Sequence, residues 1–258
     1  MQNIKGKLEN KVAIVTGSAR GIGRATAKKL ADEGARVIVM DRLQQAGQAV
    51  VDEIVQAGGQ AVYRAVELTD LSSIDAAFAS VIKDFGTVDI LVNNAGEADP
   101  MSYQGMLDID GDLYDRIMFI NVKAPFRLCQ LAIPYMEKTG EGSIVNVGSA
   151  ASTGAGRGPF VYTISKHAIL GLTREIELCH GRNGVRANCI LPGPVYTALT
   201  QKEFDNPEHP LSKFIAMSPA GRPAQPEEIA SVIVFLTTKD SWFIQGSGVA
   251  VDGGTTLC

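Results

Sequence analysis

Tyr162 and Lys166, in the segment YTISK, are the two residues whose types and spacing most directly suggest chemistry. Side chains four residues apart on a helix project from one face, so the ammonium of Lys166 can act on the phenol of Tyr162. A free tyrosine titrates near pH ~10, and a fixed positive neighbour lowers that value by stabilising the phenolate. Bringing the phenol near neutrality requires roughly 3–4 kcal/mol of differential stabilisation. The pair predicts a proton-transferring tyrosine, although many helices carry Tyr and Lys at this spacing without any such role.

A glycine-rich turn near the N-terminus is the second chemical signal. The β-branched run at 12–16 leads into TGSARGIG at 16–23, which opens a helix-like stretch. Glycines permit a tight turn and let backbone N–H groups approach a pyrophosphate, and the helix N-terminus adds partial positive charge. The spacing is GxxxGxG and not the commoner GxGxxG, but its place between a strand and a helix favours a dinucleotide site. The residues expected to contact the cofactor here are Gly17, Ser18, Arg20, Gly21, Ile22 and Gly23.

Asp41 ends the second predicted strand, about 20 residues beyond the glycine turn. An acidic group there accepts hydrogen bonds from the adenosine ribose diol and repels a 2′-phosphate, which favours NAD over NADP. Asp is also common at turns, and Arg42 or Arg20 could instead pair with a 2′-phosphate. We expect NAD, because two close negative groups repel more strongly than a mobile arginine attracts.

The alternation of strand-like and helix-like segments along the chain indicates the elements that must position these residues. Short strand-like runs alternate with longer helix-like stretches, which predicts βαβ units and a parallel sheet covered by helices on both faces. The predicted strands are 12–16, 37–40, 61–66, 88–92, 143–148, 185–191 and 247–252. The predicted helices are 22–33, 44–57, 71–85, 112–138, 160–181 and 226–236. We expect residues 1–258 to form a single domain.

Two irregular segments, 97–111 and 193–225, leave the carboxyl ends of predicted strands, where open α/β sheets bind ligands. The second is rich in proline and also carries apolar residues. A segment of this kind is expected to be a substrate lid or an inserted pair of short helices.

Composition excludes several classes of function. The net charge is −4, and Lys and Arg are scattered, so no nucleic-acid interface is expected. No apolar run approaches the ~20 residues that cross a bilayer, and the first residues, MQNIKGKLENK, lack the apolar core of a signal peptide. The four cysteines and three histidines fit no metal-ligand spacing, so we expect free thiols, no metal and a cytoplasmic location.

Seven motifs in order closely resemble those of one family, the short-chain dehydrogenases/reductases. They are TGSARGIG at 16–23, NNAG at 93–96, FINVKAPF around Asn121, IVNVGSAAS around Ser149, YTISK at 162–166, PGPVYT at 192–197 and GVAVDGG at 248–254. Ser149 precedes Tyr162 by 13 residues, a spacing common in the family. The resemblance spans about residues 8–254.

The resemblance implies a Rossmann-like doubly wound sheet of seven parallel strands in the order 3-2-1-4-5-6-7. It implies a catalytic tetrad of Asn121, Ser149, Tyr162 and Lys166, and usually a homotetramer, less often a dimer. The resemblance also implies adenine contacts of Glu67 and the Leu68 N–H, although many members have the shorter Asp at the position of Glu67. The further cofactor contacts that the resemblance implies are Asn94, Ala95, Gly96, Tyr162, Lys166, Pro192, Gly193, Val195 and Thr197, with Lys166 bonded to the nicotinamide ribose.

The expected chemistry interconverts a secondary alcohol and a ketone, with Tyr162 as general base or acid and hydride transfer to or from nicotinamide. Ser149 would stabilise the substrate oxygen, and Asn121 would hold a water that joins Lys166 to solvent. The plainer alternatives are that Ser149 caps a turn and that Asn121 bonds to backbone. We also expect Asn93 to tie neighbouring strand ends together.

The residues expected to face a substrate are mostly small or apolar, which predicts an uncharged, largely apolar alcohol or ketone. Arg157 and Glu97 could recognise an ionic group, but solvated charges are commoner at such positions. Two other functions compete with this one: an NADPH-dependent 3-oxoacyl-carrier-protein reductase, and a dinucleotide-binding sensor without turnover. The residues expected to form the walls are Met101, Tyr103, Met106, Phe204, Phe214 and Met217.

Overall fold

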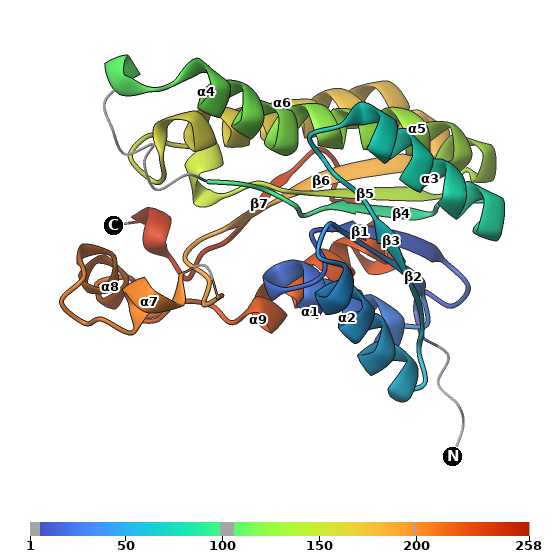
Figure 1. The fold of residues 1–258 in the computed structure, drawn as a ribbon, viewed down its shortest axis with the longest axis horizontal. Helices are drawn as coiled ribbons and strands as arrows, with labels where there is room; N and C mark the ends of the chain where they lie inside the picture. The colour runs from blue at the N-terminus through green and yellow to red at the C-terminus, as the bar shows by residue number, and fades with distance from the viewer. Residues whose placement is uncertain (1–5, 99–105, 199, 258) are drawn as a thin grey trace.

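The computed structural model describes residues 6–98, 106–198 and 200–257, and its centre is one parallel sheet of seven strands. The strand order is β3-β2-β1-β4-β5-β6-β7, as the resemblance implied (Figure 1). Because the order reverses between β1 and β4, this is where a doubly wound sheet forms its ligand crevice. The strands are β1 Val12–Thr16, β2 Arg36–Asp41, β3 Gln60–Ala65, β4 Ile90–Asn93, β5 Gly142–Val147, β6 Val185–Pro192 and β7 Gly248–Val251.

Helices cover both faces of the sheet (Figure 1). One layer contains α1 Gly21–Asp32, α2 Gln44–Gln56 and α9 Pro226–Thr237. The other contains α3 Leu71–Phe85, α4 Gly111–Met118, α5 Ala124–Thr139 and α6 Phe160–His180.

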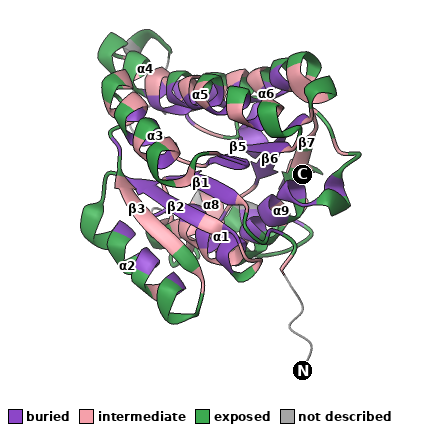
Figure 2. Ribbon diagram, turned by 90° about the vertical axis from the view of Figure 1, so that its right-hand side faces the viewer, coloured by how far each residue is buried: buried purple, intermediate pink, exposed green. Residues whose placement is uncertain are grey.

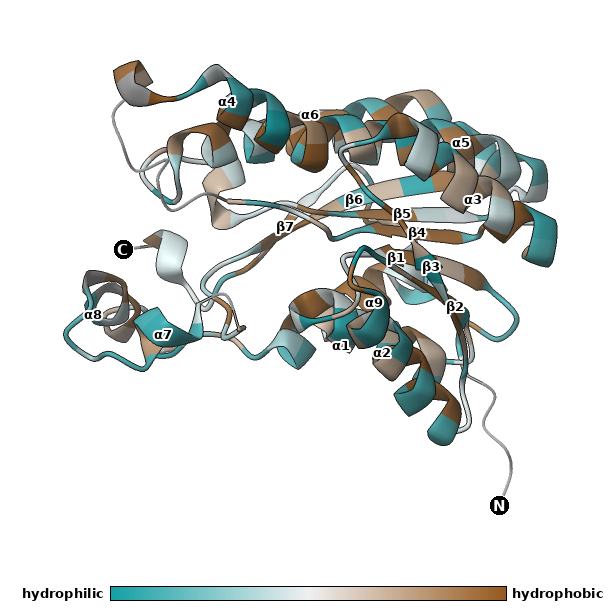
Figure 3. Ribbon diagram, viewed as in Figure 1, coloured by the Kyte–Doolittle hydropathy of each residue, from teal (hydrophilic) through white to brown (hydrophobic). Residues whose placement is uncertain are grey.

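The central strands are buried from both sides, and alternate residues along each one enter different cores. On β1, Ala13 and Val15 pack with α1, α2 and α9, whereas Val12 and Ile14 pack with α3 and α5. Since successive side chains of a strand point to opposite faces, near-continuous apolar runs such as VAIVT suit a doubly covered sheet. Figure 2 shows these strands as buried and β3, at the edge, as intermediate, and Figure 3 shows strongly hydrophobic residues along the central strands.

Two predicted helices differ from expectation. The stretch 112–138 is interrupted by a π-helical turn, Phe119–Lys123, which separates α4 from α5. On α6, Val161, Ile164, Ala168, Leu172 and Ile176 share helical spacing and predict a core-facing stripe. Ile164 is nevertheless 37% exposed, whereas Ser165 and Lys166 are buried. Buried polar residues occupy part of the helix surface that apolar residues usually cover. The 3.6-residue period of the apolar residues alone does not reveal this.

The segment 193–225 contains two short helices, α7 Gln201–Phe204 and α8 Pro210–Ala216, in accord with the expected inserted pair. They lie beside the carboxyl end of the sheet (Figure 1). Two of the residues expected to form the substrate walls, Met101 and Tyr103, and the side chain of a third, Phe214, lie outside the described part of the structure.

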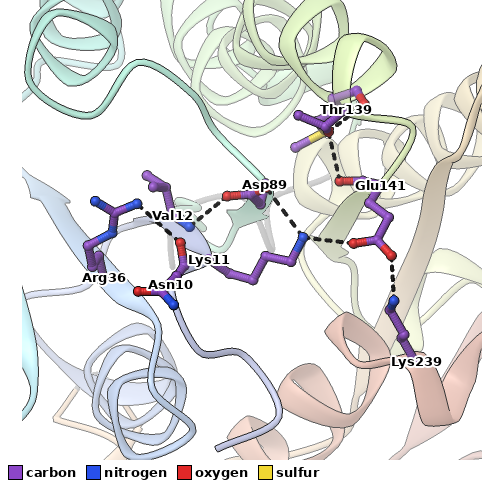
Figure 4. Close-up of polar contacts among 9 residues, drawn as sticks. Asn10, Lys11, Val12, Arg36, Asp89, Thr139, Glu141 and Lys239 are labelled. Carbon is purple, nitrogen blue, oxygen red and sulfur yellow. Dashed lines mark hydrogen bonds and ion pairs between the residues drawn. The ribbon is translucent and has the colours of Figure 1, made fainter.

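The amino ends of β1, β4 and β5 carry an ion-pair cluster of Lys11, Asp89, Glu141 and Lys239 (Figure 4). Lys11 contacts Asp89 at 3.5 Å and Glu141 at 2.9 Å, and Lys239 pairs with Glu141. Asp89 also accepts a 2.8 Å hydrogen bond from the Val12 N–H. The hydrogen bond from Lys239, followed by that from Lys11, lowers the pKa of Glu141 to about 2.

Among the described residues, no helix is both long and apolar enough to span a bilayer.

Candidate active site

Tyr162 and Lys166 lie one turn apart on α6, so the predicted shared face is confirmed. The Lys166 Nζ atom lies 5.4 Å from the centroid of the Tyr162 ring. It also donates a 2.7 Å hydrogen bond to the main-chain oxygen of Val147, the last residue of β5. Lys166 is 4% exposed, and burial lowers its pKa to about 8. An ammonium is therefore fixed between the phenol and the end of a central strand.

The pKa of Tyr162 moves in the direction opposite to the one predicted. Burial raises it above the ordinary value, while a hydrogen bond from Ser149 acts in the opposite, lowering direction. Removing the phenolate from water costs more than its neighbours return, because the Lys166 ammonium is bonded to the Val147 carbonyl and not to the phenol oxygen. The expectation of a lowered Tyr162 pKa was wrong.

Ser149 follows β5, and the turn-capping role that the sequence left open is present. Its Oγ atom accepts a 3.1 Å hydrogen bond from the Ala151 N–H, and its own N–H donates to Ser152 Oγ at 3.1 Å, which together cap a short 3-10 helix. Since that Oγ acts only as an acceptor toward Ala151, its proton is available for Tyr162. The cap holds the hydroxyl beside the phenol.

Asn121 lies in the π-helical turn, where its side chain is fully engaged as a donor. It exchanges two hydrogen bonds with the backbone of Glu97, at 2.8 and 2.9 Å, and donates a 2.9 Å bond to Ser165 Oγ. Both amide hydrogens are thus used, so the water-holding role expected for Asn121 is left to its oxygen atoms. The plainer alternative, a backbone-bonding asparagine, is therefore present.

Ser165 is a residue of this site that sequence reasoning missed. It is fully buried, accepts the bond from Asn121 and donates a 2.7 Å bond to the main-chain oxygen of Tyr162. The only available signal was its place in YTISK directly before Lys166.

The glycine turn packs against the end of β4. Gly17 has a φ of +63°, and a Cβ there would lie 2.8 Å from the Ala95 Cα. A Cβ on Gly23 would lie 2.5 Å from Asn94 Nδ2. The Asn94 amide donates to the main-chain oxygens of Thr16 and Gly17 at 2.9 and 3.1 Å. Asn94 therefore supports the turn itself, in addition to any contact with a cofactor.

Asn93 confirms the prediction that it ties strand ends together. Its amide donates a 2.8 Å hydrogen bond to Asn146 Oδ1 on the neighbouring strand β5.

Asp41 ends β2 beside the glycine turn. Its Oδ2 atom accepts a 2.9 Å hydrogen bond from the Ala19 N–H, and its Oδ1 atom accepts a 3.0 Å bond from the Leu43 N–H. An ionised carboxylate has about four acceptor positions, so two remain for a ribose diol. Arg20 and Arg42 are both exposed.

The expected adenine contacts differ in their availability. Glu67 Oε1 accepts two hydrogen bonds from Thr69, at 3.1 and 2.9 Å, so the longer side chain folds back on its own loop. Leu68 is partly buried against the core.

The segment after β6 returns to the glycine turn. Val195 forms a β-bridge with Ala224, and the Thr197 Cγ2 atom lies 3.5 Å from where a Cβ on Gly21 would be. A Cβ on Gly193 would lie 2.8 Å from the Asp252 Cα. Pro192 and Gly193 thus turn the chain past the crevice, and Thr197 lies against the opening of α1, near Ile22.

These features fit a nicotinamide dinucleotide. A Cβ on Gly96 would come within 3.3 Å of Lys166 Nζ and 3.5 Å of Asn121 Oδ1, so the glycine lets the backbone after β4 lie close to both side chains. The turn supplies backbone N–H groups for a pyrophosphate, and Asp41 supplies acceptors for a ribose. Asp41, the glycine turn and Lys166 therefore follow one another as the adenosine ribose, the pyrophosphate and the nicotinamide end of a dinucleotide would.

Glu97 and Arg157, the two charged residues that could recognise an ionic group, are both bonded to other groups of the protein. Arg116 pairs with Glu97, with N–O distances of 3.0 and 3.1 Å, and Arg157 donates a 3.2 Å bond to the main-chain oxygen of Thr256. Several large apolar side chains on the surrounding segments are exposed: Met106, Leu107, Phe160, Met217 and Leu257.

Comparison with known proteins gives consistent results over nearly the whole chain. The family model described as "Enoyl-(Acyl carrier protein) reductase" matches residues 17–256. The chain is 35% identical over 250 residues to a cyclohexanol dehydrogenase of Acinetobacter sp. (strain SE19), covering 97% of this chain and 96% of the relative. It is 34% identical over 252 residues to a 3-oxoacyl-acyl-carrier-protein reductase of Thermotoga maritima, covering 97% and 100%.

A solved structure has the same fold. A putative NAD(P)-dependent gluconate 5-dehydrogenase from Beutenbergia cavernae, with bound NADP at low occupancy, superposes with a TM-score of 0.90 at 33% identity and covers 97% of this chain and 98% of that one. Fold, site geometry and relatives agree, and the chain belongs to the short-chain dehydrogenase/reductase family of oxidoreductases, whose members bind a nicotinamide dinucleotide.

Proposed function

We propose that this protein is an NAD-dependent oxidoreductase that interconverts a secondary alcohol and a ketone. The observation that carries the proposal is the meeting of Tyr162, Ser149, Lys166 and Asn121 at the carboxyl end of the sheet, beside the glycine turn. The family match supports action on CH–OH groups.

In oxidation, Tyr162 accepts the proton of the substrate hydroxyl while the carbinol C–H bond breaks and a C=O bond forms. Bound NAD would accept the hydrogen of that C–H bond together with its two electrons, as a hydride. In reduction, Tyr162 returns the proton to the developing alkoxide. Because burial raises the pKa of Tyr162, the phenol keeps its proton at neutral pH, and we expect the oxidation rate to increase as the pH rises.

The other tetrad residues orient and stabilise these steps. The Ser149 hydroxyl donates to the substrate oxygen as negative charge develops on it. The Lys166 ammonium favours the phenolate electrostatically. Asn121 fixes the loop after β4 through its two bonds to Glu97, so that Gly96 stays close to Lys166.

NAD is proposed over NADP because Asp41 ends β2 beside the glycine turn with two acceptor positions left, which would suit the ribose diol of NAD. A 2′-phosphate there would meet a carboxylate that is 8% exposed, and screening by water is weak at such a site. The assay follows the absorbance of the reduced nicotinamide over a panel of secondary alcohols with NAD and then NADP. A kcat/KM that is higher with NADP for the best alcohol would contradict this choice.

An uncharged, largely apolar substrate is proposed from the exposed apolar residues around the site and from the engagement of its charged groups. Glu97 is paired with Arg116, and Arg157 is bonded to the Thr256 carbonyl. We expect cyclic and long-chain alcohols to react with higher kcat/KM than hydroxy acids of similar size. A strong preference for anionic substrates that disappears in Arg157→Ala would contradict this.

The second candidate is an NADPH-dependent 3-oxoacyl-carrier-protein reductase, favoured by the relative from Thermotoga maritima. Asp41 and the net charge of −4 argue against NADPH and against an acidic carrier. A sensor without turnover is disfavoured by the presence of both Tyr162 and Lys166. Tight NAD binding without turnover of any alcohol or ketone would favour the sensor.

We also propose a homotetramer, or else a dimer, located in the cytoplasm. Edge strand β7 and exposed side chains nearby, Leu178, Trp242 and Phe243, are available for subunit contacts. Unpaired thiols at Cys129, Cys179 and Cys189 suit a reducing compartment. Light scattering on the purified protein measures the assembly, and a monomer at micromolar concentration would contradict it.

A further inference from the structure

Asp41 is held in place through its main chain as well as its carboxylate. The hydroxyl of Tyr63, on β3, donates a 2.6 Å hydrogen bond to the main-chain oxygen of Asp41. The same oxygen accepts a longer bond of 3.2 Å from the Val66 N–H. Tyr63 lies opposite Val39 in the parallel register, so its side chain reaches two residues along β2 to make this contact.

The Tyr63 ring depends on Gly47 for its position. A Cβ on Gly47, in α2, would lie 2.5 Å from the Tyr63 Cδ2 atom. Gly in a helix costs stability relative to Ala, and the conformation of Gly47 is an ordinary helical one. The close approach of the Tyr63 ring is therefore what requires the missing side chain.

Three separate elements thus restrain Asp41, two through its carboxylate and one through its main chain. The N–H groups of Ala19 in the glycine turn and of Leu43 in the loop before α2 each donate a hydrogen bond to a different oxygen of the carboxylate. The hydroxyl of Tyr63 on β3 donates to the main-chain oxygen of Asp41. Burial, with the negative charge of Asp41, raises the pKa of Tyr63, so the hydroxyl remains a donor at physiological pH. A carboxylate with this many restraints has little room to swing aside for a 2′-phosphate.

We propose that Tyr63, with Gly47, is a positioning residue for cofactor selectivity: it holds Asp41 where the carboxylate binds the ribose diol of NAD and repels the 2′-phosphate of NADP. The inference rests on the proposed use of NAD. Tyr63 touches neither the tetrad nor the reacting atoms, so its effect is expected in cofactor binding and not in turnover.

The test compares Tyr63→Phe, which removes only the hydroxyl, with the parent protein. Calorimetric titration gives the Kd of NAD and of NADP, and steady-state kinetics give kcat at saturating NAD. One lost hydrogen bond to a backbone oxygen predicts an about 3- to 10-fold rise in the Kd of NAD. The Kd of NADP should stay the same or fall, so that the ratio of the two constants drops, while kcat changes less than about 2-fold.

A second variant and a matched control separate positioning from general stability. Gly47→Ala should lower the same ratio, because the added methyl displaces the Tyr63 ring although alanine favours the helix. Tyr135→Phe, a partly buried tyrosine on α5 that packs on Phe78, should leave the ratio unchanged.

The outcomes distinguish this inference from the function on which it rests. A parent protein that prefers NAD, with variants that keep the same ratio, overturns the role of Tyr63 alone. A parent protein that binds NADP more tightly than NAD overturns both. Equal weakening of NAD and NADP in Tyr63→Phe would show a purely structural role and would also overturn the inference.

Discussion

Replacement of Lys166 by methionine should change how stability depends on pH, because Lys166 is a buried cation. Burial lowers its pKa from 10.5 to about 8, with the neighbouring Cys189 acting in the opposite direction. Between these values the unfolded chain binds a proton that the folded protein does not, so the Lys166 contribution to stability rises with pH. It is fully present above pH 10.5 and is lost as the pH falls through 8.

The size of this effect follows from the difference between the two pKa values. At about 1.4 kcal/mol per pH unit, the complete change is about 3 kcal/mol. Urea denaturation followed by the fluorescence of Trp242, the single tryptophan, gives the free energy of unfolding. From pH 7 to pH 10, the parent protein should gain about 2 kcal/mol relative to Lys166→Met.

The absolute difference between the two proteins also includes the lost bond to Val147, so the predicted quantity is its change with pH. Lys138→Met, at an exposed lysine on α5, is the control, because no burial penalty exists there to be relieved. A parent-to-variant difference that is constant from pH 7 to pH 10 would refute the reasoning that burial controls the Lys166 charge.

Three further predictions concern other parts of the molecule. Ser149→Ala should lower kcat about 10²- to 10³-fold with little change in the Kd of NAD, and an unchanged kcat would contradict its role as donor. Asn94→Ala removes two hydrogen bonds to the glycine turn, so it should reduce the free energy of unfolding by about 1–3 kcal/mol and weaken NAD binding in calorimetry. The control Asn183→Ala removes a surface bond to Glu137 and should change neither quantity. Glu141→Gln should lower the free energy of unfolding by at most about 1 kcal/mol at pH 7, because the Glu141 side chain is 39% exposed. This loss should shrink in high salt and as the pH falls from 4.5 toward 2. A loss of stability that does not depend on salt would contradict the ion-pair explanation.

The sheet and the glycine turn could be predicted from the sequence because their signals are local. The alternation of β-branched runs with helix-like stretches gave the βαβ units, and each observed strand overlaps its expected range. The glycine spacing placed a turn between β1 and α1, where Gly17 and Gly23 do make close backbone approaches. Asn93 was expected at a strand end, and its bond to Asn146 follows from the strand order.

The remaining features depend on contacts between distant segments. The bonds of Asn121 to Glu97 and Ser165 require the approach of three elements, so no local pattern indicates them. Ile164 is exposed although its spacing places it with apolar residues of α6. The buried face of the helix carries Ser165 and Lys166 instead, so the apolar period does not identify that face here.

The raised pKa of Tyr162 also could not be read from spacing. The four-residue separation from Lys166 predicts proximity, but the pKa is set by burial and by the hydrogen-bond partner of each group. The support of Asp41 by Tyr63 likewise arises from the pairing of β2 with β3.

The most direct test of the proposed chemistry is the rate of alcohol oxidation by Tyr162→Phe with saturating NAD. Loss of the single hydroxyl should lower kcat by about 10²- to 10⁴-fold, while calorimetry shows NAD binding within about 2-fold of the parent. A variant that oxidises its best alcohol as fast as the parent would contradict the assignment of Tyr162 as the proton acceptor.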